Sequence, residues 1–167
     1  MAPEAEEQKT AESWISSDWI KAWLPVLIGV ALIATSSSNL FSAQHTNGPF
    51  RWLYETLFGP VGDDRWGQVH LYMRKGGHFF GYGVFGLLWL RAWRITLPQY
   101  RFLLDSLLAV LGCAIVASAD EFHQTFLSNR TGTPWDVLLD CTGAATLQLI
   151  VYIFLRIFRP RQLEIPA

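Results

Sequence analysis

The sequence has little cysteine and little charge, and neither sign of charge is in excess. Its two cysteines, Cys113 and Cys141, both stand in apolar stretches, which excludes a disulfide framework, a CxxC redox pair and a zinc finger. The 13 basic and 14 acidic residues nearly cancel, so the electrostatic footprint of a nucleic-acid-binding protein is missing. The sequence contains neither the G-x-S-x-G elbow of serine hydrolases nor the H-E-x-x-H motif of zinc proteases.

What the chain does contain is long apolar sequence between patches of charge. Residues 22–44 carry no formal charge, and as an α-helix they would extend about 34 Å, more than the roughly 30 Å of a bilayer's hydrocarbon layer. Three further segments, 76–93, 102–126 and 134–158, are candidate spans, the first of them if Arg91 snorkels to the interface. The sequence therefore predicts an all-α, polytopic membrane protein with four transmembrane helices in a single domain, residues 1–167.

Charge also predicts how the spans are oriented. Residues 1–21 are acidic rather than basic, so we expect an uncleaved first span and not a signal peptide. The side that holds this segment, the connection before residue 102 and the tail 159–167 carries eight Lys and Arg residues, counting Arg91 and Arg156 at the ends of the adjoining spans. The opposite side, with the loop 45–75 and the connection before residue 134, carries five. This bias places both termini in the cytoplasm and the loop 45–75 outside.

Within that loop, Pro49 to Phe58 has apolar residues at helical spacing. We expect a short helix lying in the membrane interface and ending at Gly59-Pro60. It would serve either as a simple interfacial anchor or as a lid over the outer face.

Polar residues gather at one end of the predicted bundle. In a four-span chain the end of the first helix, the start of the second, the end of the third and the start of the fourth all lie on one side. An acid in the middle of a membrane helix costs roughly 2.5–3.5 kcal/mol, so such residues should face the bundle interior. We expect a polar pocket on the outer-leaflet side, and its candidate ligand-binding residues are Lys75, His78, Tyr82, Asp120, Glu121, His123, Gln124, Arg130, Asp136 and Asp140.

Several of these residues also have a purely structural interpretation. Asp136 stands three residues after Thr133 at a predicted helix start, where an acid stabilises the first turn, so it is a helix cap or a site residue. Arg130 either neutralises a neighbouring carboxylate or contacts a ligand. His123 lies near the interface, where a solvated histidine is common. At the other membrane surface, Arg101 and Asp105 are four residues apart and predict a local ion pair.

A metal site is an alternative interpretation of the same residues. Carboxylates together with His78 and His123 could hold a divalent ion, but the spacing D-E-x-H-Q is not specific for one. The neighbouring Lys75 and Arg130 would oppose a cation. We therefore expect no metal and no other cofactor.

The pattern of these polar and glycine residues resembles the VanZ-like family of membrane proteins. The resemblance covers roughly Arg74 to Gly143 together with the surrounding spans. It rests on three groups of residues, which are Arg74, Lys75, His78, Phe79 and Tyr82, then Asp120, Glu121, His123, Gln124 and Phe126, and finally Arg130, Gly132, Asp136, Val137, Asp140 and Gly143. The family often has an acid just before the tyrosine, where this chain has Gly81.

The resemblance implies a multi-pass protein of the bacterial cytoplasmic (inner) membrane. The namesake of the family is linked to antibiotic resistance, namely resistance to teicoplanin, a lipid-tailed glycopeptide. Membrane lipids are expected partners, with a lipid-linked envelope molecule or a lipoglycopeptide as a further one. The oligomeric state stays open.

Three functional hypotheses follow, of which binding without catalysis is the first. A molecule of the cell envelope would place its head group against Lys75 and Arg130, which Glu121, Gln124 and Asp140 would orient, while Tyr82 and apolar helix faces would contact the lipid tail. In the second, the protein is an intramembrane enzyme that acts on a lipid or polyprenyl substrate, with His78 or Glu121 as general base. In the third, the polar layer only fixes the register of the helices.

Overall fold

A computed structural model describes residues 2–37, 43–127 and 132–158 of the chain. All regular structure in these ranges is helical, as predicted, and no strand occurs in them. The helices are α1 (Ala2–Ser36), α2 (Ala43–Phe58), α3 (Asp63–Thr96), α4 (Phe102–Gln124) and α5 (Pro134–Ile157).

Three segments among the described residues are long and apolar enough to cross a membrane. They are Ser17–Ser36 of α1, the whole of α4 and the whole of α5. Their outward faces carry large apolar side chains, such as Leu32 and Ile115, which are 65% and 63% exposed. Since a soluble protein rarely exposes so much apolar surface, these faces fit contact with lipid, and the chain is a helical membrane protein. The remaining predicted span, 76–93, lies mostly in the second half of α3, and this helix is not among the three.

Several helix ends differ from the predicted spans. α1 ends at Ser36, whereas the first span was predicted to continue to residue 44, and α2 has already begun at Ala43. The predicted loop 45–75 is mostly helical, because it contains α2 and the first turns of α3. Asp63 and Asp64 stand in the first turn of α3, where acidic side chains interact favourably with the helix dipole. α2 ends at Phe58, directly before the predicted stop at Gly59-Pro60, and a φ of +89° explains why glycine occupies position 59.

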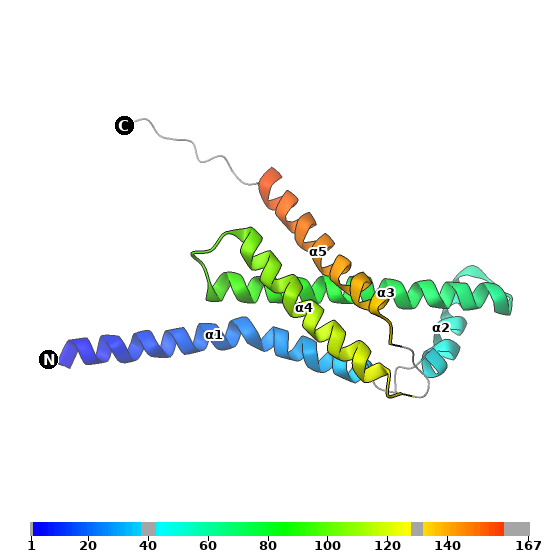
Figure 1. Cartoon of the computed structure of the whole chain (residues 1–167), viewed down its shortest axis with the longest axis horizontal. Coiled ribbons are helices and arrows are strands. Elements are labelled where there is room, and N and C mark those ends of the chain that lie inside the picture. The colour runs from blue at the N-terminus through cyan, green and yellow to red at the C-terminus, as the bar shows by residue number, and fades with distance from the viewer. Residues whose placement is uncertain (1, 38–42, 128–131, 159–167) are drawn as a thin grey trace.

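α3 lies at the centre of the bundle, and α4 and α5 cross it diagonally while α1 lies along its other side (Figure 1). The end of α4 and the start of α5 meet on the same side of the bundle as the end of α1, near α2 (Figure 1). The connection from α3 to α4 and the end of α5 lie on the opposite side. The end of α1, the end of α4 and the start of α5 therefore share one side of the bundle, as predicted.

Small residues let α3 and α5 approach each other closely. A Cβ atom added at Gly143 would lie 2.1 Å from the carbonyl oxygen of Phe79, and one added at Gly86 would lie 2.7 Å from the Cβ of Ala144. In membranes, where burial of apolar side chains drives helix association little, such close backbone contact is a main source of stability. The contact also fixes the position of α5 along the axis of α3.

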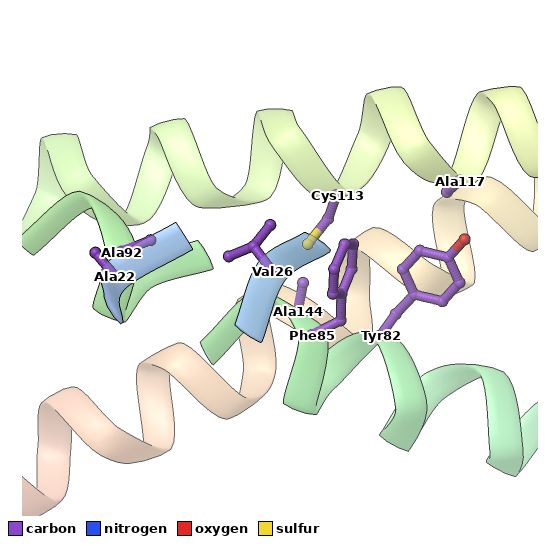
Figure 2. Close-up of a cluster of buried hydrophobic side chains, with 8 residues drawn as sticks. All are labelled: Ala22, Val26, Tyr82, Phe85, Ala92, Cys113, Ala117 and Ala144. Carbon is purple, nitrogen blue, oxygen red and sulfur yellow. The ribbon is translucent and has the colours of Figure 1, made fainter. Parts of the chain in front are cut away.

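The apolar core draws on all four long helices. Figure 2 shows Val26 of α1, Phe85 of α3, Cys113 of α4 and Ala144 of α5 converging, and each is at most 3% exposed. Cys113 is thus a packing residue, as its apolar surroundings in the sequence suggest.

At the end of the bundle away from the polar residues, Asp105 is 1% exposed and pairs with Arg94 of α3 at 3.5 Å. The predicted partner, Arg101, forms no ion pair with Asp105 among the described residues. The prediction was wrong because it considered only neighbours on one helix, whereas the connection between α3 and α4 brings Arg94 across to the start of α4.

We expect Arg94→Leu to destabilise the protein by about 1–3 kcal/mol, because it leaves a buried carboxylate without its cation. Arg91→Leu is the matched control, since Arg91 only donates to the exposed Lys21 carbonyl at 3.1 Å. Thermal unfolding in detergent measures both. Equal shifts in the two variants would show that Asp105 does not depend on Arg94.

Hydrogen bonds and ion pairs of Arg51 hold α2 against the start of α3. Arg51 of α2 donates to Asp63 at 2.7 Å, to Glu55 at 3.0 Å and to the carbonyl of Val61 at 2.9 Å. Beneath α2, the ring of His70 stacks on Trp66, with centroids 5.6 Å apart. Burial lowers the pKa of His70, and the charge of Arg74 lowers it further.

The lowered pKa of His70 predicts that α2 docks less firmly in acid. The folded state favours the neutral ring of His70, and histidine has a pKa of about 6.5 in the unfolded state. The contribution of His70 to the docking of α2 is therefore complete above about pH 6.5. It is lost progressively as the pH falls from there through the lower pKa of the folded state. Hydrogen exchange in α2, compared at each pH with that of His70→Gln, should rise in acid in the wild type only. A pH response that survives in His70→Gln would contradict this assignment.

Candidate functional site

The centre of the candidate site is a contact between α3 and α5. Nδ1 of His78 lies 3.2 Å from Oδ1 of Asp140, and the Asp140 side chain is fully buried. The close approach of Gly143 to the Phe79 carbonyl explains this geometry, because Phe79 follows His78 directly and Gly143 lies one turn after Asp140. The packing of small residues therefore positions the polar pair.

α4 adds a second buried carboxylate to this pair. Glu121 is 5% exposed, and one ligating atom from each of His78, Glu121 and Asp140 lies within 4.8 Å of the others. Oε2 of Glu121 accepts a hydrogen bond of 2.8 Å from the backbone N–H of Thr133. Gly132 makes this possible, since a Cβ at this position would lie 2.1 Å from the carbonyl oxygen of Glu121. We refer to His78, Glu121 and Asp140 as the carboxylate–histidine cluster.

Two polar atoms beside this cluster lack hydrogen-bond partners within the described part of the chain. One is Oδ2 of Asp140, and the other is the hydroxyl of Tyr82. Tyr82 stacks on His78, with 6.4 Å between ring centroids and 14° between ring planes. Its hydroxyl projects towards Ala117 on α4 (Figure 2). A buried polar atom without a partner costs about 1–3 kcal/mol, so the cluster is arranged at the expense of stability.

A second ion pair lies one helical turn nearer the bundle's polar end. Nζ of Lys75 is 2.6 Å from Oδ1 of Asp136. Asp136 is also part of a helix cap, because its backbone N–H donates to the Thr133 hydroxyl at 3.3 Å, while that hydroxyl donates to Oδ2 of Asp136 at 3.0 Å. The predicted cap at Thr133 is confirmed. Asp136 therefore takes part in the cap of α5 and neutralises Lys75, while its role as a ligand-binding residue stays a prediction.

Asp120, His123 and Gln124 lie on α4 but outside the cluster. Nε2 of Gln124 donates to Oδ2 of Asp120 at 3.0 Å, and Gln124 is buried. His123 is exposed and lines, with Asp120, a hollow of about 270 Å³ between α1 and α4. Arg130 falls outside the described residues, so its predicted role stays a prediction.

A second hollow, of about 360 Å³, opens where α4 leads into α5. Phe122, Pro134 and Val137 give it mainly apolar walls, and Glu121 contributes to one of them. Both hollows are open on the outer surface of the helices. Their walls are mainly apolar, so the polar pocket predicted on the outer-leaflet side stays a prediction.

One buried polar side chain inside the bundle was not among the predicted site residues. Gln148 of α5 is fully buried, donates to the carbonyl of Gly86 at 3.2 Å and accepts a hydrogen bond from Ser106. The signal was visible, because Gln148 is a polar residue in an otherwise apolar stretch of α5. Gln148 lies in the middle of α5, away from the helix ends at which the polar site was predicted.

Apolar helices that enclose a carboxylate–histidine cluster define an integral membrane protein with a buried polar site. Comparison with known proteins identifies the family. A family model described as VanZ/LLP1 matches residues 20–156, and the chain therefore belongs to the VanZ-like family, as the polar pattern predicted. No curated protein and no solved structure matches the chain.

Proposed function

We propose that this chain is a four-span protein of the bacterial cytoplasmic membrane that binds an amphipathic envelope molecule from the outer leaflet. One observation carries the proposal, which is that Glu121 belongs both to the buried cluster and to the wall of the larger, apolar hollow. The polar head of the ligand would meet the carboxylate–histidine cluster. Its lipid tail would lie in the hollow, which is open towards the surrounding lipid.

The length and packing of α3 support a fourth crossing. Its 34 residues extend about 51 Å, which exceeds the roughly 30 Å of the hydrocarbon layer and leaves its first turns outside. Tyr82, Phe85 and Leu90 are buried among the neighbouring helices, so the less apolar composition of α3 suits a central position. Only residues 97–101 connect α3 with α4, so the two helices enter the membrane from the same side. The excess of Lys and Arg supports a cytoplasmic position for this side and for both termini.

The charges in the site favour a head group that donates hydrogen bonds. Lys75 is already paired with Asp136, which leaves the acceptors Glu121 and Asp140 facing His78. Hydroxyl, amine and amide groups are their natural partners. An envelope lipid, a wall precursor and a lipid-tailed glycopeptide such as teicoplanin all combine such donors with a tail. Arg130 is the residue that we propose for an anionic part of the head.

Binding is tested with Glu121→Gln and the matched control Asp105→Asn, which removes an equally buried carboxylate at the far end of α4. We expect Glu121→Gln to weaken binding of the ligand about tenfold or more, since a hydrogen bond to a charged group is worth about 1.5–3 kcal/mol. The control should stay within about twofold of the wild type. The measurement titrates purified protein with teicoplanin and with a polyprenyl-linked wall precursor. Equal affinities in all three proteins would remove the proposal.

A second candidate function is an intramembrane enzyme that acts on a lipid or polyprenyl substrate. The contact between His78 and Asp140 favours it, because a carboxylate on one ring nitrogen orients histidine as a general base. Turnover of a candidate lipid by the purified protein, abolished in His78→Gln, would distinguish catalysis from binding. Binding without turnover would exclude the enzyme and leave the first proposal standing.

A further inference from the structure

We propose that the carboxylate–histidine cluster binds one divalent metal ion, Zn²⁺ or Mn²⁺. The sequence predicts no metal, but the structure changes two of the facts on which that prediction rests. The histidine beside the carboxylates is His78 of α3, whereas exposed His123 lies apart from them. Lys75, which was expected to repel a cation, is held by Asp136 at 2.6 Å.

The geometry of the three side chains fits a metal ion. Their ligating atoms lie within 4.8 Å of one another, and three different helices supply them. Ligands of a tetrahedral ion with bonds of about 2.1 Å are about 3.4 Å apart. Side-chain rotations alone would close that difference. The backbone of each ligand is meanwhile fixed by the contacts at Gly132 and Gly143.

Charge and hydrogen bonding also favour a metal ion in the cluster. Glu121 and Asp140 are both more than nine-tenths buried, and two carboxylates so close together need a cation or a shared proton. Oδ2 of Asp140 is fully buried without a hydrogen-bond partner among the described residues, so it retains the capacity to bind a metal. Oε2 of Glu121 is already oriented by the N–H of Thr133, which is the kind of outer contact that holds a metal ligand in place.

The ligand set favours an ion of intermediate softness. One imidazole nitrogen and two carboxylate oxygens suit Zn²⁺ or Mn²⁺, while Ca²⁺ prefers oxygen alone and Cu(I) prefers sulfur. Three protein ligands leave at least one coordination position free, as in catalytic metal sites. Since Glu121 lines the larger hollow, an oxygen of a bound head group or a water would complete the coordination. Metal binding itself does not depend on the proposed envelope ligand.

The experiment uses the full-length chain in detergent and the metal ions alone. After treatment with a chelator, the protein is titrated with Zn²⁺ and, separately, with Mn²⁺, and bound metal is counted by mass spectrometry. We expect about one ion per wild-type chain. Loss of an outer contact already costs about 10–100-fold in metal affinity, so His78→Gln and Asp140→Asn, which each remove a direct ligand, should bind at least about 100-fold more weakly.

Two matched variants control for binding elsewhere. Asp105→Asn and His123→Gln remove the same residue types from α4 outside the cluster, and each should retain the wild-type affinity. Zn²⁺ should also raise the melting temperature of the wild type and of both controls, but not that of the two ligand variants. Should a substitution prevent folding, the number of metal ions bound by the wild-type chain alone tests the proposal. A wild-type chain that binds no ion, or controls that lose the metal as fully as the ligand variants, would overturn the proposal in favour of a shared proton.

Discussion

Gly143→Ala is expected to lower the stability of the folded chain by about 3 kcal/mol and to break the contact between His78 and Asp140. The added Cβ would lie 2.1 Å from the carbonyl oxygen of Phe79, which is backbone and cannot rotate away. α3 and α5 must then separate, and the polar pair that their close approach creates is lost with it. Thermal unfolding in detergent measures the loss, and binding of teicoplanin or a wall precursor to the fraction still folded should fall as well.

Gly81→Ala is the control for this substitution. Gly81 lies on α3, the helix that α5 packs against at Gly143, but a Cβ at position 81 would meet no atom of a neighbouring helix within 4 Å. Alanine is a better helix former than glycine, so stability should stay the same or rise slightly. If the two variants were equally stable, the close packing of α3 on α5 could not be what positions the site.

His78→Leu is expected to have a still larger effect on stability, about 3–5 kcal/mol. It leaves Asp140 fully buried with neither carboxylate oxygen paired, because His78 is the partner of Oδ1 and Oδ2 has none among the described residues. The double variant His78→Leu/Asp140→Leu removes both polar groups together. Replacement of a buried ion pair by apolar residues is often neutral, so the double variant should regain most of the lost stability.

The double variant separates a functional cluster from a purely structural one. If the cluster binds a ligand, His78→Leu/Asp140→Leu will be stable but will bind teicoplanin or a wall precursor at least about tenfold more weakly. If the polar layer only sets helix register, binding will recover together with stability. Melting temperature and affinity are measured on the same preparations, so that each protein reports both quantities. Recovery of both would establish the structural interpretation instead.

Much of the fold could be predicted because a helix that crosses the bilayer must be apolar over the thickness of the hydrocarbon layer. The starts of α4 and α5 agree with the predicted spans, and their ends lie within a few residues of them. α3 was harder to delimit, because its apolar part continues into the polar helix that begins at Asp63. Apolar length alone does not show where a helix stops once it has left the membrane.

The candidate site could be predicted as a layer but not as a set of contacts. Connectivity places His78, Glu121 and Asp140 at one end of the bundle, and the structure brings them within 4.8 Å. Helix rotation decides which residues meet, and a single sequence does not reveal it. His123 follows Glu121 by only two residues yet faces another surface, and Lys75 meets Asp136 rather than the cluster. Gln148 was not predicted because it lies in the middle of α5, away from the helix ends at which the site was expected.

The account depends most on the meeting of His78 and Asp140 inside the bilayer. Solid-state NMR can measure this distance in lipid, with ¹⁵N in the histidine rings and ¹³C in the aspartate carboxyl groups. We predict that one ring nitrogen lies about 4 Å from a carboxyl carbon, as a direct hydrogen bond requires, and that His78→Gln abolishes the signal. A wild-type spectrum with no such pair closer than about 6 Å would contradict the proposed cluster.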